Sequence, residues 1–273
     1  MGDPARAEQP VRRLARIYVR LRVLQLRSAL EYRGDFWLSI LGAVLQQLTG
    51  VVFAVVLFTS VPDVLGWGPW EVALLFGLVM LPAGLVELLS DGPWSLRTTV
   101  NSGSFDRVLL RPLPPALQVA AEHFTVHGLG NALLGAVLVV AGLTGADAWR
   151  WWTVPFLVLT VVAGTVLVTA VTFLANMVVF WEPSATSTFP VFVVLTRDFA
   201  KFPLDLYPPA LQVVLSSLPP FAFTSCFPAL LLLDRGGSLR WLGLATPLVA
   251  ALVALLAAVA WRAALRRYEG AGH

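Results

Sequence analysis

Long apolar stretches alternate with short polar segments along this chain, and the pattern predicts helices that cross a membrane. A spanning helix needs about 20 residues, because the hydrocarbon layer of a bilayer is about 30 Å thick. The apolar stretches suited to this role, of which the fifth is the shortest, cover about residues 36–60, 70–91, 116–143, 152–181, 184–202 and 239–262. We therefore predict an all-α polytopic membrane protein with six transmembrane helices.

These spans set the predicted domain organisation. Residues 36–262 form the transmembrane domain, residues 1–35 an N-terminal cytoplasmic segment, and residues 263–273 a cytoplasmic tail. The charged region of the N-terminal segment is too long for a cleaved signal peptide, and no short apolar core with a cleavage site follows it. We therefore expect this segment to stay attached.

The N-terminal segment also has the pattern of an amphipathic helix. Apolar residues at helical spacing face one side and arginines the other, as in a helix that lies on a membrane surface. Additional apolar residues blur the pattern, so a plain basic topology anchor is the alternative. The apolar face consists of Leu14, Ile17, Leu21 and Leu24, and the basic face of Arg12, Arg16, Arg20 and Arg27.

Residues 92–115 form a polar island between the second and third predicted spans. Ser102 or Ser104 can cap a short helix there, and Asp106 is favourable in its first turn. Residues 108–110 then form an apolar ridge between Arg107 and Arg111. A short helix with charged flanks and an apolar centre suits docking into a groove of another protein. A solvated connecting loop is the alternative.

Prolines divide the apolar segment 203–234 into pieces that are too short to cross a bilayer, because proline lacks an N–H and clashes inside a helix. We expect an outer re-entrant helical hairpin before the last span. Non-helical backbone at that depth must be covered by protein or line a water-filled cavity. The prolines are Pro203, Pro208, Pro209, Pro219, Pro220 and Pro228.

The basic residues predict the orientation, because cytoplasmic segments collect Lys and Arg. With the N-terminus inside, the cytoplasmic side holds eight arginines before residue 36, three in 92–115 and three after residue 261. The outer side holds five basic residues: Arg150, Arg197, Lys201, Arg235 and Arg240. Both termini are therefore expected in the cytoplasm.

Composition agrees with a membrane protein and excludes some activities. The chain is 58% hydrophobic and 13% charged, with a mean hydropathy of +0.78, whereas soluble domains have about 25% charged residues. Its one cysteine, Cys226, cannot form an intramolecular disulfide. Its one lysine, Lys201, follows Ala200, so the glycine-lysine pair of a nucleotide-binding P-loop is missing. The arginines lie at the ends of apolar runs, so we expect membrane lipid and not nucleic acid as a partner.

Several polar residues are candidates for chemistry, each with a plainer alternative. Glu122, His123 and His127 have helical spacing but no obvious third metal ligand, so we expect no metal. Glu87 and Asp91 could relay protons, but pairing with Arg97 or another loop arginine is the preferred interpretation.

Other polar and aromatic residues are candidates for a transport path. Arg197, Asp198 and Lys201 are expected near the outer end of the fifth span, as a structural group that reaches the interface. Candidates for lining or gating a path are Gln46, Gln47, Asn176, Phe221 and Phe223.

Three separated motifs resemble a family of six-span bacterial ABC type-2 exporter permeases. "SGSFDRVLLRPLPP" (102–115) is similar to the family's cytoplasmic coupling helix. "FPLDLYPPALQVVLSSLPPFAFTSCFPALLLL" (202–233) resembles its outer segment, and "ALRRYEGAG" (264–272) its C-terminal ending. The chain departs from the family at Cys226, where a tyrosine is frequent, and in its short fifth span.

The resemblance implies a permease subunit of the bacterial plasma membrane with no catalytic activity or cofactor of its own. Two permeases, identical or paralogous, would each press a coupling helix into a cytosolic ATPase subunit that binds ATP and Mg. The coupling residues would be Ser104, Phe105, Asp106, Arg107, Val108, Leu109, Leu110 and Arg111. Two alternatives are an ion-coupled secondary transporter and an intramembrane enzyme that uses Glu122, His123 and His127.

Overall fold

The computed structural model describes residues 4–60, 66–182 and 188–268, and for residues 4–11, 58 and 59 only the backbone. All regular structure in these ranges is helical, as the sequence predicts. The long helices are α1 (Pro4–Glu31), α2 (Arg33–Ser60), α3 (Pro69–Leu89), α7 (His127–Gly145), α8 (Thr153–Asn176) and α12 (Thr246–Arg267). The shorter α-helices are α4 (Leu96–Asn101), α5 (Phe105–Leu109), α6 (Pro115–Ala121), α9 (Thr188–Phe199), α10 (Pro209–Ser217) and α11 (Cys226–Leu232).

Five 3-10 segments connect these helices. They are η1 (Gly92–Ser95), η2 (Met177–Phe180), η3 (Leu204–Leu206), η4 (Phe221–Phe223) and η5 (Gly237–Ala245).

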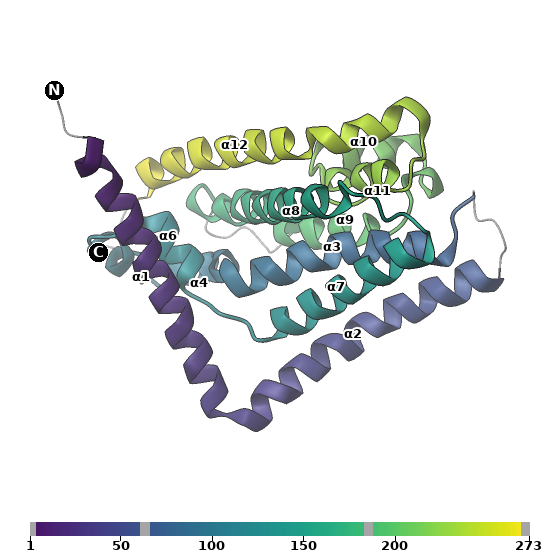
Figure 1. Ribbon diagram of the computed structural model, residues 1–273. Helices are drawn as coiled ribbons and strands as arrows, with labels where there is room; N and C mark the ends of the chain where they lie inside the picture. Colours follow the sequence, from purple (N-terminus) through teal and green to yellow (C-terminus); the bar gives the residue numbers. More distant parts are fainter. Residues whose placement is uncertain (1–3, 61–65, 183–187, 269–273) are drawn as a thin grey trace.

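The long helices form a bundle with two distinct ends (Figure 1). α1, α4, α6 and the C-terminal end of α12 gather at one end, which we call the α5 end because it also carries α5. α10 and α11 lie at the opposite end, which we call the α11 end. Within the described ranges, five helices are long and apolar enough to cross a membrane, or six spans if the bent pair formed by α10 and η4–α11 counts as one.

Glycines hold α3 and α7 in close contact at the centre of the bundle. Gly77 and Gly84 on α3, and Gly128, Gly135 and Gly142 on α7, recur every seven residues and so lie along one face of each helix. A Cβ added to Gly135 would lie 2.5 Å from the backbone N of Leu81. Small residues allow membrane helices to approach at backbone distance, where dispersion replaces the hydrophobic effect as the attractive force.

Two predicted spans differ from the structure. The segment 116–143 is divided into α6 and α7 by a non-helical break at residues 122–126, so only α7 is a candidate span. The fifth segment, predicted over 184–202, contains the 12-residue helix α9. At about 1.5 Å per residue this helix covers about 18 Å, less than the thickness of a bilayer. Residues 184–187 lie outside the described residues.

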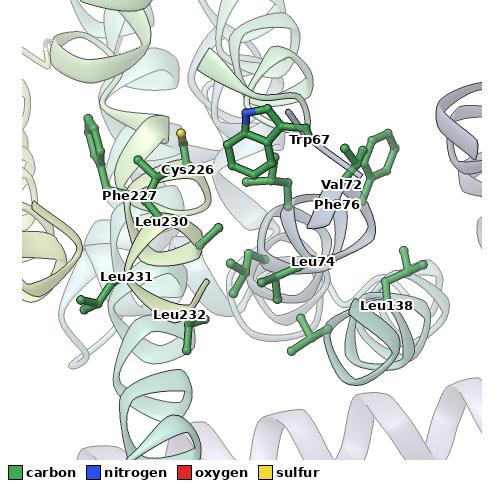
Figure 2. Packing of buried hydrophobic residues seen from close by; sticks show 14 of the residues in the cluster. Trp67, Val72, Leu74, Phe76, Leu138, Cys226, Phe227, Leu230, Leu231 and Leu232 are labelled. Carbon is green, nitrogen blue, oxygen red and sulfur yellow. The ribbon is translucent and has the colours of Figure 1, made fainter. Parts of the chain in front are cut away.

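The proline-rich segment after α9 forms short helices that pack onto α3. α10 and the η4–α11 stretch meet at an angle of 72°. Every residue of α11 is buried, and Figure 2 shows this helix beside Trp67 and Leu74, with the ring of Phe227 on its far side. The prolines thus produce the short half-helices that the sequence predicts.

α1 lies across the α5 end at a steep angle to α2 (Figure 1). The side chain that docks it is Arg22, which is only 8% exposed. Its guanidinium donates to the carbonyl oxygens of Leu89 (2.6 Å), Ala120 (2.6 Å) and His123 (2.7 Å). Gln25 donates to a fourth carbonyl, that of Ala121 (2.9 Å). α1 therefore caps the ends of α3 and α6, since the last carbonyls of a helix lack intrahelical partners.

The apolar face predicted for α1 is only partly covered. Leu14 and Ile17 are half-buried against the rest of the chain, whereas Leu24 is 60% exposed. The helix therefore packs through Arg22 and Gln25 and leaves an apolar surface open on its other side.

Candidate functional site

α5 is a single turn of helix that follows a tight turn at Gly103. Gly103 has a φ of +70°, a left-handed conformation that glycine adopts without strain. The backbone N–H of Asp106 donates to the Gly103 carbonyl (3.2 Å), which connects the turn to the helix. Behind the helix, the Gln118 side chain of α6 donates to the carbonyls of Val108 (2.9 Å) and Leu113 (2.8 Å). α5 is thus fixed at both ends.

An aromatic cluster anchors α5 to the membrane helices. Phe105 is fully buried, and its ring packs edge-on against Phe180 (centroids 5.2 Å apart), Trp261 (6.4 Å) and Tyr268 (5.0 Å). These partners come from η2, from α12 and from the residue that follows α12. Edge-to-face pairs add about 0.5–1.5 kcal/mol each beyond the burial of area. A displacement of α5 must therefore move the ends of α8 and α12 with it.

Tyr268 joins two distant segments of the sequence. Its hydroxyl donates to the carboxylate of Asp106 at 2.9 Å, across 162 positions in the chain. The segment 102–115 and the C-terminal segment that begins at residue 264 therefore meet at the α5 end. Residues 269–272 of the C-terminal motif lie outside the described residues.

The outward side of α5, which we call the docking face, consists of Arg107, Leu109, Leu110 and Arg111. Leu110 is 85% exposed and Leu109 45%. Arg107 donates to the hydroxyl of Ser104 (2.9 Å), which places its charge beside the apolar ridge. Phe105 was expected on this face but points into the aromatic cluster. Its position in the first turn of α5 places its ring beside Trp261 of α12, whereas Leu109 and Leu110 lie on the opposite side.

A second polar group lies inside the bundle, and we call it the polar layer. Asn131 donates to both carboxylate oxygens of Glu87 (2.8 and 3.1 Å), and Nδ1 of His127 lies 3.5 Å from the same carboxylate. Gln46, which is exposed on α2 at the edge of this group, lies 3.3 Å from Nε2 of His127. Polar side chains at this depth satisfy one another, because the hydrocarbon of a bilayer offers no hydrogen-bond partners.

α9 completes the polar layer with Arg197 and Asp198, together with Lys201, which lies two residues beyond the end of the helix. Lys201 pairs with Asp198 (2.8 Å) and donates to Gln47 (3.3 Å), and its ammonium lies 5.9 Å from the centre of the Phe76 ring. Arg197 shares cavities with Glu87. These residues therefore lie within the bundle and not at its outer end as expected, because α9 is too short to carry them there.

The basic residues at the α11 end are all paired with acids. Arg235 pairs with Glu71 (2.6 Å), Arg150 pairs with Asp234 (3.4 Å), and Arg240 pairs with Asp234 as well. Without Arg197 and Lys201, the predicted outer side keeps only these three basic residues.

Comparison with known protein families agrees with this arrangement. The family described as "ABC-2 family transporter protein" matches residues 44–272, which is most of the chain. The chain belongs to the ABC-2 transporter family. No curated protein and no solved structure matches it. As a member of this family, the ABC-2 protein is a multi-pass membrane component of a transporter.

Several candidate residues of the ABC-2 protein have structural roles that the sequence did not predict. Glu122 accepts from Ser95 (3.0 Å) and Thr99 (3.3 Å), and the break at 122–126 removes His123 and His127 from a common helical face. The described part of the chain contains no group of three metal-ligating side chains. Asp91 accepts from Thr125.

The pathway candidates separate into two groups. Gln46 and Gln47 lie in the polar layer, as described above. Asn176 is buried and donates to the carbonyl of Thr172 within α8 (2.9 Å). Phe221 is fully buried, and Phe223 packs edge-on against Phe227 at 4.7 Å. These three residues therefore belong to the packed interior.

Sequence reasoning did not predict the contacts made by Arg22, Asn131 and Tyr268. Arg22 was one of eight arginines in the N-terminal segment and had no distinguishing neighbour. Asn131 has a usable signal, since it follows His127 by one helical turn inside an apolar stretch.

Proposed function

We propose that this chain is the permease subunit of an ATP-driven exporter, and that the docking face of α5 inserts into a groove of a separate cytosolic ATPase. The observation that carries the proposal is Leu110, which is 85% exposed on a short helix that is itself rigidly anchored. An exposed apolar ridge between two arginines suits a protein groove with an apolar floor and an acidic rim. ATP and Mg would bind the ATPase subunit, since this chain lacks a P-loop.

The anchoring of α5 supports a mechanical role. A push on Leu109 and Leu110 would pass through the Phe105 ring to Phe180 and Trp261, at the ends of α8 and α12. The Asp106–Tyr268 hydrogen bond ties the same turn to the C-terminal segment. Closure of the ATPase pair would thus tilt α8 and α12, and the transport path would open alternately to the cytoplasm and to the outside. The hydrophobic or amphiphilic substrate expected for this family would then leave the cell.

The assembly and orientation follow from the same proposal. The α5 end, with its arginine-rich segments, would face the cytoplasm of a bacterial cell, and both termini would lie on that side. The span that contains α2 is only 11% buried, compared with 67% for α3. That exposure leaves room for a second permease, identical or paralogous, and for lipid.

Changing Leu110 to aspartate tests the proposal. We expect Leu110→Asp to reduce the ATPase retained by the tagged permease by at least about tenfold, because a charge in an apolar groove costs well over 1.4 kcal/mol. The measurement is quantitative copurification in detergent from cells that express both subunits. Thr98→Asp adds the same charge at an exposed position of α4 and is the matched control. Equal retention by both variants would contradict the proposal.

An ion-coupled secondary transporter is the second candidate, and the polar layer is the observation in its favour. Glu87 and His127 are ionisable groups inside the bundle, as in proton relays. Transport by membrane vesicles separates the two functions. The exporter requires ATP and persists when a protonophore collapses the proton gradient, whereas the ion-coupled transporter requires the gradient and no ATP.

A further inference from the structure

One charged side chain of the polar layer, that of Arg197, has no hydrogen-bond or ion-pair partner among the described residues. Lys201 pairs with Asp198 (2.8 Å), and Glu87 accepts from Asn131 (2.8 and 3.1 Å). Arg197 is half-buried on α9, and its side chain makes no hydrogen bond or ion pair with any residue that the structure describes. A charged group inside a membrane bundle is costly without a counter-charge. The guanidinium of Arg197 is therefore available to an anionic group of a bound molecule.

Arg197 lines a cavity of about 300 Å³ that has room for such a molecule. The cavity lies toward the α5 end, since Asp91 follows the last residues of α3 and Thr125 precedes α7. Glu87, Asp91 and Trp94 line it together with Arg197. The carboxylates of Glu87 and Asp91 form no ion pair with the guanidinium of Arg197, although the three side chains line the same cavity. This volume is at the lower end of the usual range for small-molecule sites, about 300–1,000 Å³.

The charges on the cavity walls select the kind of ligand. A simple anion would be attracted by Arg197 but repelled by both Glu87 and Asp91, whereas a simple cation would be attracted by the two carboxylates but would leave Arg197 without a counter-charge. A molecule that carries both charges can place its negative group at Arg197 and its positive group at Glu87 and Asp91.

We propose that the cavity binds a small zwitterion, with its carboxylate or phosphate at Arg197 and its ammonium group at Glu87 and Asp91. If the proposed function is correct, on which this assignment rests, the zwitterionic group belongs to the amphiphilic molecule that is transported.

Binding to the purified protein tests the proposal directly. The probes are glycylglycine and phosphoethanolamine, which are zwitterions with a carboxylate and a phosphate, and ethylamine and acetate, which each carry one charge. We expect calorimetry to show binding of at least one zwitterion, and affinities for ethylamine and acetate at least about tenfold weaker, because each lacks one charge-assisted contact. Preference for phosphoethanolamine would indicate a lipid headgroup as the source, and preference for glycylglycine a free solute. The proposal would be overturned if neither zwitterion bound. It would also be overturned if ethylamine or acetate bound with the same affinity as the better zwitterion.

Two variants connect the binding to the cavity. Arg197→Gln is expected to weaken binding of the zwitterion at least about tenfold with little change in thermal stability, because the side chain has no hydrogen bond or ion pair with the described residues to lose. Arg262→Gln, at an exposed position of α12, is the control.

Glu87→Gln is the second cavity variant. It is expected to reduce the ratio of the affinities for the zwitterion and for acetate, since one carboxylate that repels acetate is removed. Unchanged binding by both cavity variants would overturn the proposal. These measurements need no ATPase, so their failure is separate from failure of the Leu110 test.

Discussion

Replacing Gly84 by alanine is expected to destabilise the folded protein by about 3 kcal/mol, because the α3–α7 contact has no space for a methyl group. A Cβ at this position would lie 2.7 Å from the carbonyl oxygen of Gly128 and closer still to the backbone of Ala132. Since these neighbours are backbone atoms, the two helices themselves would have to move apart. The measurement is the temperature at which half of the detergent-purified protein loses its monodisperse peak in size-exclusion chromatography.

Gly42 provides the matched control for this substitution. It also lies within a long apolar helix, but a Cβ added there would meet no atom within 4 Å. Gly42→Ala should leave the unfolding temperature unchanged or slightly higher, because alanine has the greater helix propensity. Equal loss of stability in the two variants would show that glycine is required for a reason other than close packing of α3 and α7.

Removal of Arg22 is the second large effect that we expect. Arg22→Ala leaves three carbonyls at the ends of α3 and α6 without their donor, and each unpaired buried group costs about 1–3 kcal/mol. We expect a loss of about 3–5 kcal/mol in the free energy of unfolding, allowing for access of water to part of the site. Hydrogen exchange should show α1 detached from the α5 end while α3 and α7 stay protected.

Two further variants separate charge from geometry at this position. Arg22→Lys keeps the charge but lacks the planar fork that reaches several carbonyls, so it should recover only part of the stability. Arg20→Ala removes an exposed arginine of the same helix and should have little effect. If Arg20→Ala were as damaging as Arg22→Ala, the net basic charge of α1 and not the capping bonds would hold the helix.

The sequence predicted the features that depend on the composition of a segment. Apolar length is enough to find a spanning helix, and this criterion located α2, α3, α8 and α12 because each of them is long and uninterrupted. The prolines around residues 203–220 correctly predicted short helices, since the missing N–H and the ring clash act locally. Local chemistry also predicted a short helix within the polar segment 92–115, where α5 lies.

Features that depend on which neighbour a side chain meets were not predictable. Phe105 was counted among the coupling residues through the family resemblance, yet its partners Phe180 and Trp261 come from distant parts of the chain. The third span was drawn from residue 116, because the break at 122–126 contains few helix-breaking residues and depends on the tertiary contacts of Glu122 and Asp91. The polar layer was missed for a similar reason, since Glu87, Asn131 and Lys201 are far apart in sequence.

The central claim is that the docking face of α5 lies in the cytosol and contacts an ATPase. A single cysteine at position 110, in a chain where the buried Cys226 is replaced by alanine, tests it most directly. We predict that a membrane-impermeant maleimide labels Leu110→Cys only after the cells are permeabilised, and that coexpressed ATPase protects it. Labelling of intact cells would place the docking face on the outer surface and contradict both the orientation and the partner.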